Sequence, residues 1–195
     1  MTDQTGWSSL LHEESEDHAM QMANLSCRCG EVKLTVEGLH IASVECLCSS
    51  CQTAAQTLEA LPGAAAVLDA KGATPFVLYR KDRIAIVAGQ DKLKAHRLSN
   101  DAGTRRVVAT CCNTPVFMEL KGGHWLSLYA ALWSDEDRPA IEMRTMTGAR
   151  KDLPSDVPNL KTHSLAFYGR LFGAWTRMGF RNPQIADNGE LHAGQ

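Results

Sequence analysis

The chain has 195 residues, of which 44% are hydrophobic and 22% charged, and its formal net charge is −2 at pH 7. This composition is ordinary for one globular domain that can bury its own core. The near-neutral charge gives no indication of a nucleic-acid partner. No stretch approaches the roughly 20 apolar residues that a membrane-spanning helix requires, so a membrane protein is not expected.

The first 24 residues are polar and acidic, and we expect a flexible acidic arm over residues 1–24. Through Met22 the chain has no lysine or arginine and no long apolar run, which argues against a secretory signal and a mitochondrial presequence. We therefore expect a cytoplasmic protein, in which cysteine thiols stay reduced. The acidic residues of this arm are Asp3, Glu13, Glu14, Glu16 and Asp17.

Residues 25–150 are expected to form a mainly β, mostly antiparallel domain with short helices. Residues 31–37 alternate between apolar and polar side chains, as a half-buried strand does. A short helix is predicted over residues 52–61, ended by Pro62 and Gly63. Lys121-Gly122-Gly123 is typical of a hairpin link between two strands. Further strands are predicted over residues 76–80, 84–88, 105–110, 115–120, 125–130 and 141–146.

The C-terminal part differs in character, with a connection and an amphipathic helix expected over residues 151–181 and a polar tail over residues 182–195. Ser164 is a suitable N-cap for the helix. We expect its apolar face to pack on the sheet or on a second subunit, which would make a homo-oligomer. That face is predicted to carry Leu165, Tyr168, Leu171, Phe172, Trp175 and Met178, and the opposite face Arg170, Arg177 and Arg181.

Seven cysteines lie in three groups along the chain. Because the number is odd and the thiols are expected to be reduced, metal ligation is favoured over disulfides. Each pair alone could equally be buried free cysteine, but three groups in one chain favour zinc. The groups are Cys27 and Cys29, then Cys46, Cys48 and Cys51, and finally Cys111 and Cys112.

The middle group has the pattern C-x-C-x2-C and can offer three thiolates from one segment. A catalytic zinc has three protein ligands and keeps its fourth position for water or substrate. Cys27 and Cys29 can supply two ligands to a second ion, with Gly30 allowing the tight turn. Since adjacent residues seldom bind the same metal, we expect one of Cys111 and Cys112 to bind and the other to be a spare.

Three segments of the sequence resemble the glutathione-dependent formaldehyde-activating family, also called the centromere-protein-V-like family. The resemblance covers roughly residues 25–133 and includes residues 87–93. The matching cysteine segments are Ser26-Cys27-Arg28-Cys29-Gly30, Cys46-Leu47-Cys48-Ser49-Ser50-Cys51-Gln52 and Cys112-Asn113-Thr114-Pro115.

The resemblance implies a β-tent fold with two zinc sites. It implies that Cys46, Cys48 and Cys51 hold a catalytic zinc, and that Cys27, Cys29 and Cys112 are three of four structural ligands. The family's third segment usually reads C-x-x-C-G-T-P, whereas this chain has Ala109 and Asn113 at the first cysteine and the glycine positions. Either Cys111 replaces the missing ligand or that zinc is absent.

The reaction that the resemblance implies joins glutathione and formaldehyde reversibly, as a carbon–sulfur lyase. The partner would be a small thiol such as glutathione. His40, His96 and His124 are candidate bases by residue type, although each could equally be a surface or structural histidine. Arg105 and Arg106 could bind carboxylates of such a ligand, or could lie on a solvated strand edge.

Two further interpretations remain open. One is a non-enzymatic zinc module in which all zinc is structural and the surface binds another protein. The other uses the arginine face of the C-terminal helix to dock on an anionic membrane or a partner. Coordination separates the enzyme from the first alternative, since an enzyme needs an open fourth position beside a cleft.

Overall fold

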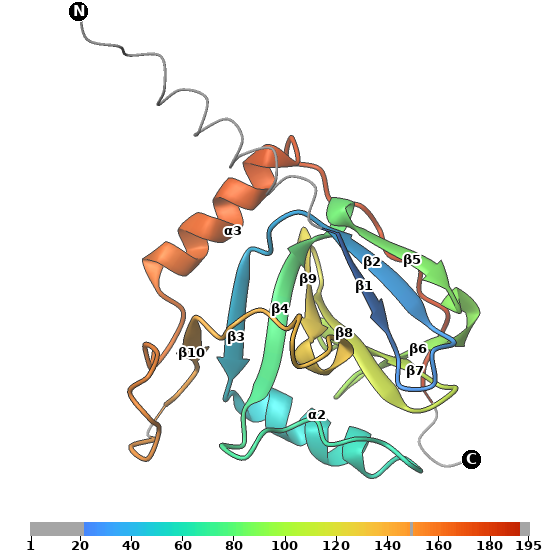
Figure 1. Cartoon of the computed structure of the whole chain (residues 1–195), viewed down its shortest axis with the longest axis horizontal. Helices are drawn as coiled ribbons and strands as arrows, with labels where there is room; N and C mark the ends of the chain where they lie inside the picture. Colours follow the sequence, from blue (N-terminus) through green and yellow to red (C-terminus); the bar gives the residue numbers. More distant parts are fainter. Residues whose placement is uncertain (1–21, 149, 192–195) are drawn as a thin grey trace, which may run out of the picture.

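The computed structural model describes residues 22–148 and 150–191. Within these ranges the protein is mainly β with two α-helices, as predicted (Figure 1). Residues 1–21 of the expected arm and residues 192–195 of the expected tail lie outside the described residues. The strands are β1 (Met22–Ser26), β2 (Lys33–Glu37), β3 (Ala42–Cys46), β4 (Thr74–Arg80), β5 (Ile84–Ala88), β6 (Leu93–His96), β7 (Thr104–Ala109), β8 (Thr114–Leu120), β9 (Trp125–Tyr129) and β10 (Met143–Thr145), and the helices are α2 (Ser49–Glu59) and α3 (Leu165–Arg177).

The smaller sheet has three antiparallel strands in the order β1-β2-β5. The alternation predicted for this part is confirmed, because Leu34 and Val36 of β2 are buried while Lys33 and Glu37 are exposed. The strand β1 begins at Met22, so the chain is already in the sheet where the sequence predicted the last residues of a flexible arm.

The larger sheet has seven strands in the order β10-β3-β4-β9-β8-β7-β6. Neighbours are antiparallel except for β10 and β3, which pair in parallel. The predicted hairpin link joins β8 to β9, where the Gly123 N–H donates to the Leu120 carbonyl at 2.9 Å. The structure adds two strands of this sheet that the sequence pattern did not indicate, β3 and β6.

The seven-stranded sheet carries a different layer on each face. On one face, Leu34 of the small sheet packs in a cluster with Leu128 of β9. On the other face, Phe76 of β4 packs in a second cluster with Leu58 of α2 and Leu171 of α3. The two helices therefore pack on one face and the small sheet on the other; in Figure 1 the small sheet lies to the right, α3 to the upper left and α2 below.

Helix α3 begins after Ser164, whose Oγ accepts the Phe167 N–H at 3.1 Å, so the predicted N-cap is confirmed. The predicted buried face is wrong for much of the helix. Leu165 is 90% exposed, and Tyr168 and Phe172 are more than half exposed. The buried positions follow the spacing i, i+4, i+7, i+11, which places one narrow stripe against the sheet. They are Phe167, Leu171, Ala174 and Met178.

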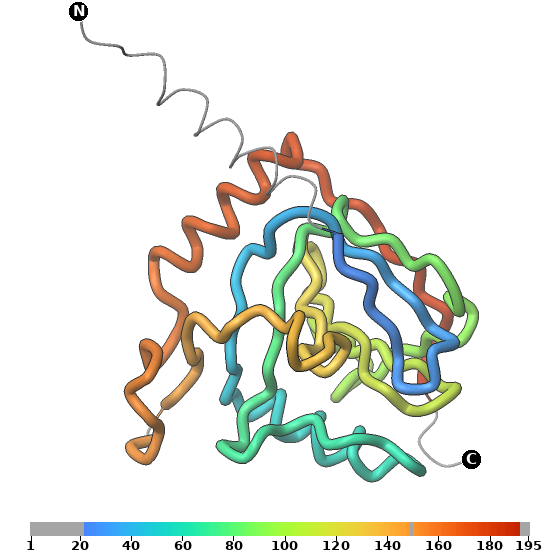
Figure 2. The backbone as a smooth tube through the Cα atoms, viewed as in Figure 1, coloured from blue at the N-terminus to red at the C-terminus, as the bar shows by residue number. Residues whose placement is uncertain are grey.

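After α3 the chain crosses back over the molecule to the free edge of β6 (Figure 2). The Ala95 N–H donates to the Gly189 carbonyl at 2.9 Å, and the Leu191 N–H donates to the Ala95 carbonyl at 2.6 Å. Residues 182–191, expected as a polar tail, are thus held against the sheet. Neither helix in the described ranges has the length and apolar character that crossing a membrane requires.

Candidate metal centres

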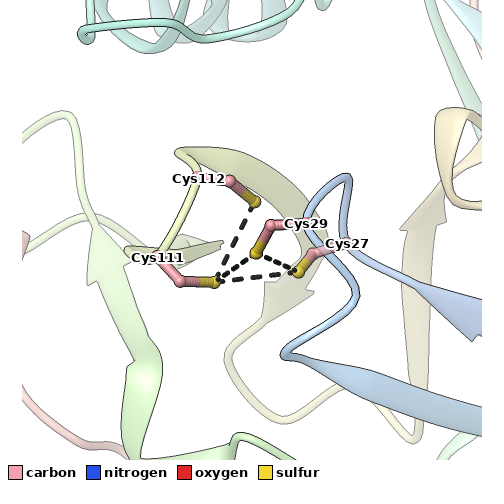
Figure 3. A group of neighbouring side chains, drawn as sticks. All are labelled: Cys27, Cys29, Cys111 and Cys112. Carbon is pink, nitrogen blue, oxygen red and sulfur yellow. Dashed lines mark hydrogen bonds between the residues drawn. The ribbon is translucent and has the colours of Figure 1, made fainter.

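Four cysteines from two turns that are distant in the sequence lie close together (Figure 3). Cys27 and Cys29 lie in the β1–β2 turn, and Cys111 and Cys112 lie in the β7–β8 turn. Their four Sγ atoms all lie within 4.8 Å of one another. We call this group the four-thiol cluster.

Local backbone structure aims these thiols inward. Gly30 has φ of 77°, the left-handed conformation that the sequence predicted for it. The turn is closed by the Gly30 N–H, which donates to the Cys27 carbonyl at 2.9 Å, and the Val32 N–H donates to Cys27 Sγ at 3.3 Å. Asn113 also has a positive φ, 54°, which asparagine tolerates better than most residues and which turns the chain directly after Cys112.

The spacing of the four thiols suits a tetrahedral metal ion. With zinc–sulfur bonds of about 2.3 Å, the edges of an S4 tetrahedron are about 3.8 Å long. The Sγ atom of Cys111 lies 3.7 Å from Cys27, 3.3 Å from Cys29 and 3.9 Å from Cys112. The distances of Cys111 to Cys27 and Cys112 match the tetrahedral edge, whereas those between Cys29 and Cys111 and between Cys27 and Cys29, at 3.3 and 3.5 Å, are shorter.

Both adjacent cysteines lie in the cluster, and the expectation that only one of them binds a metal stays a prediction. Residue 109 is an alanine and is fully buried. Burial raises the pKa of Cys112, but hydrogen bonds with Thr114 Oγ1 at 3.0 Å and with the Cys29 backbone outweigh it and lower that pKa to about 6. Burial raises the pKa of Cys111. The cluster therefore already favours a thiolate at Cys112, which is the form that binds metal.

The other three cysteines form a second group at the junction of β3 and α2. Cys46 ends β3, Cys48 is the N-cap of α2, and Cys51 lies in its first turn. Helix α2 begins three residues earlier than predicted because the Cys48 sulfur accepts the Cys51 N–H at 3.4 Å. The three Sγ atoms lie within 4.8 Å of one another, with Cys46 and Cys51 3.8 Å apart. We call this group the three-thiol cluster.

The position of Cys48 favours its thiolate. Hydrogen bonds from the Cys46 and then the Cys51 thiols lower the pKa of Cys48. The N-terminus of a helix adds a favourable field for negative charge. The hydrogen bond with Cys46 and burial raise the pKa of Cys51. The cluster thus holds one thiolate readily and gains the other two when a cation binds.

Arg106 lies next to the three-thiol cluster and is fully buried. Its Nη2 donates to the Ser50 carbonyl at 3.1 Å, between two of the cysteines in sequence, and its Nε has no hydrogen-bond partner among the described residues. Three thiolates and a divalent ion leave one net negative charge. With such an ion bound, a buried guanidinium beside it would offset that charge.

The two arginines proposed as ligand-binding residues lie elsewhere than expected. Neither is on a solvated strand edge, because β7 lies between β6 and β8. Arg105 is buried and its Nε donates to Glu119 at 2.6 Å, while its Nη2 donates to the Ile185 carbonyl at 2.8 Å. Arg105 is therefore engaged by the protein itself, and Arg106 faces the Ser50 backbone.

A cavity of about 240 Å³ opens beside Cys46, which forms part of its wall. We call it the apolar cavity. Strands β3, β4, β8 and β9 form its floor, and Phe167 and Leu171 of α3 form much of its outer wall. Cys46 is partly buried and so is Cys48, whereas Cys51 is buried. The three-thiol cluster thus has a space next to it where a small molecule can lie.

The histidine in the cavity wall is His163, which no sequence pattern indicated. Its ring stacks on Phe167 with centroids 4.7 Å apart, and burial lowers its pKa. The three selected histidines are not among the residues of this wall. His40 pairs with Glu142 at 2.9 Å, His96 lies on β6, and the ring Nε2 of His124 lies 2.9 Å from the Leu171 carbonyl.

Comparisons with known proteins give a family but no activity. Residues 19–132 match the family of unknown function DUF6151, a range that contains all seven cysteines and ends before α3. No curated protein matches the chain. Among solved structures, a crystal structure of a Rhodobacter sphaeroides protein is similar, with 15% identity and a TM-score of 0.43 over 61% of this chain and 97% of that one.

Proposed function

The chain belongs to the family of unknown function DUF6151, and we propose that it holds zinc at both cysteine clusters and acts as a carbon–sulfur lyase on thiol adducts of a small aldehyde. The four-thiol cluster would be structural, since four protein ligands fill a tetrahedral zinc. The three-thiol cluster would be catalytic. The observation that carries the proposal is a group of three thiols with a cavity beside it.

Zinc is the metal that the donor set favours, because tetrahedral all-sulfur and sulfur-rich sites suit it. When bound, zinc lowers the pKa of a thiol that coordinates it, so that a thiolate exists at neutral pH. The resemblance of the cysteine segments to the glutathione-dependent formaldehyde-activating family supports the same metal and reaction class. A small thiol would be the partner, and glutathione is the one that the resemblance names.

The residues of the chain have distinct parts in this reaction. Cys46, Cys48 and Cys51 hold the ion, and the Arg106 charge offsets the negative charge of the three thiolates. His163 takes the proton that leaves the thiol and returns it to the oxygen of the adduct. A cavity wall of apolar side chains keeps bulk water from the reacting atoms.

The test is turnover by the zinc-loaded chain. Formaldehyde and a thiol are mixed with protein, and the hydroxymethyl thioether that forms is followed by NMR. We expect faster adduct formation than without protein, and we expect the Cys48→Ser variant to lose this effect together with one zinc. If fully zinc-loaded wild-type protein forms the adduct no faster than the protein-free mixture does, with every thiol tried, the lyase proposal is contradicted.

A second candidate function is a non-enzymatic zinc module that binds another protein. The observation that favours it is the exposed apolar side of α3, formed by Leu165, Tyr168 and Phe172. Exposed apolar patches of this kind mark interaction surfaces. A homo-oligomer through this helix stays a prediction, and light scattering of wild type and Phe172→Glu checks it. A membrane-docking role for the arginine side is less favoured, because Arg170 is paired with Glu142.

A further inference from the structure

The wall of the apolar cavity is almost free of charge. No lysine, arginine, aspartate or glutamate lines it within the described residues. Apart from short side chains, Cys46 and His163, the polar groups of the wall are the Tyr168 hydroxyl and the Trp125 indole N–H. The rest of the wall is aliphatic and aromatic and includes Phe76, Leu78, Met118, Trp125, Phe167 and Leu171.

We propose that this cavity takes a compact thiol with an aliphatic or aromatic group and does not accept glutathione. This inference rests on the proposed function, because it names the substrate class of the same site. In the reaction, the thiol sulfur forms a bond to the aldehyde carbon while the carbonyl π pair becomes an O–H bond with the proton from sulfur. The reverse reaction breaks the C–S bond, so no oxidant or reductant is needed.

Size gives the first reason. Cavities that hold drug-sized ligands span about 300–1,000 Å³, whereas this one has about 240 Å³. The outer wall is held in place, because Phe167 and Leu171 are 5% and 6% exposed and are packed in the same core cluster as Phe76. A tripeptide such as glutathione would have to leave much of its length outside.

Charge gives the second reason. Glutathione carries two carboxylates and one ammonium group at neutral pH, and a buried charge without a partner costs several kcal/mol. Neither arginine of β7, Arg105 or Arg106, lines the cavity. Arg105 is bound to Glu119, and Arg106 is 0% exposed and bound to the Ser50 carbonyl. An uncharged hydrocarbon group instead gains about 25 cal/mol for each Å² that it buries.

The experiment compares two probes on the zinc-loaded full-length chain. Phenylmethanethiol represents the compact apolar thiols, and glutathione represents the charged ones. Binding is measured by calorimetry and by the fluorescence change of the cavity tryptophan, Trp125, and adduct formation with formaldehyde is followed by NMR. We expect phenylmethanethiol to bind at least about tenfold more tightly than glutathione.

Substitutions at Met118 localise the effect. Met118→Trp fills the cavity and should weaken phenylmethanethiol binding about tenfold or more. Met118→Arg supplies a cation and should reduce the difference in affinity between phenylmethanethiol and glutathione. Leu39→Trp, on an exposed residue away from this wall, is the matched control and should change neither affinity.

The two proposals fail in different ways. Glutathione that binds and reacts as well as phenylmethanethiol overturns the apolar specificity and leaves the lyase intact. If neither thiol binds or reacts at full zinc loading, the lyase and the specificity are both overturned. If Met118→Trp weakens the binding of both thiols equally, the proposed specificity is also contradicted, because the two ligands would then share one site.

Discussion

The two cysteine clusters are built in opposite ways. The four-thiol cluster joins turns that lie 84 residues apart in the sequence, through Cys27 and Cys111. The three-thiol cluster comes from one stretch of six residues and has the apolar cavity beside it. A cluster that joins distant segments stabilises the fold, whereas a local cluster adds little cross-linking and is free to serve chemistry. The predictions below test this division.

Removing a thiol from each cluster should separate stability from activity most clearly. Cys27→Ser is expected to cost more than about 4 kcal/mol of unfolding free energy, because loss of a metal is among the most destabilising changes. For a chain of this size that is a fall in Tm of about 10 °C or more. Cys48→Ser should cost much less stability while abolishing turnover.

Calorimetry and zinc analysis of both variants measure the effect. A chelator added to the wild type should lower Tm toward the value of the Cys27→Ser protein. If Cys48→Ser is the less stable of the two variants, the division between a structural and a catalytic cluster is wrong.

His163 should matter only for the three-thiol cluster. The variant His163→Phe keeps an aromatic ring to stack on Phe167 but cannot carry a proton. We expect turnover to fall about 100-fold with zinc content and Tm unchanged. His40→Phe is the matched control, because His40 pairs with Glu142 and is not in the cavity wall. Equal activity of His163→Phe and wild type would remove His163 from the reaction.

Arg106 should affect zinc affinity at the three-thiol cluster and not at the four-thiol cluster. Replacing it with methionine removes the positive charge beside the three-thiol cluster while keeping a long side chain. Substitutions of groups that surround metal ligands typically lower affinity about 10- to 100-fold, and we expect this loss at one of two ions. Competition with a zinc-binding dye measures both affinities. Arg106→Lys should recover part of the lost affinity. A uniform loss at both ions would show that the charge acts through general destabilisation.

Acidification should first weaken the packing of helix α3 beside the apolar cavity. Burial lowers the pKa of His124, which contacts the Leu171 carbonyl of α3 and stacks on Trp175. Because the unfolded histidine has a pKa of about 6.5, the unfolded state binds more protons below that pH. Stability from neutral His124 is therefore full above about pH 6.5 and falls as the pH drops below it.

Hydrogen exchange at pH 7.5 and pH 6.0, corrected for the pH dependence of the intrinsic exchange rate and with zinc content checked at both, should show weaker protection of α3 at the lower pH and little change in the β1–β2 turn. This is the smallest of the expected effects. His124→Gln keeps an N–H donor for the Leu171 carbonyl and should remove the pH difference in α3. Persistence of the difference in that variant would assign it to another group.

Local patterns in the sequence predicted the parts of the sites that are local. The three-thiol cluster lies in one segment, so spacing alone was enough to bring Cys46, Cys48 and Cys51 together. Cys111 and Cys112 both lie in the four-thiol cluster because of the geometry of the β7–β8 turn, which residue spacing does not reveal. His163 was missed for the same reason, since more than 100 residues separate it from the three-thiol cluster and only the packing of α3 brings it to the cavity.

The fold was predictable where apolar alternation is strong and less so where buried positions are polar. Strand β3 was missed because two of its five residues, Ser43 and Glu45, are polar yet buried. Glu45 is there because it accepts a hydrogen bond from Arg144 Nε at 2.6 Å, a partner 99 residues away. In α3 the largest side chains suggested the wrong face, because the stripe that meets the sheet includes the small Ala174.

The central claim is that each chain holds two zinc ions, one in each cluster. Native mass spectrometry of protein purified under reducing, zinc-replete conditions tests it most directly. The account predicts a mass that corresponds to two zinc ions per chain, falling to one in Cys48→Ser. A wild-type chain that carries no zinc, or one that keeps both ions in Cys48→Ser, would contradict the account.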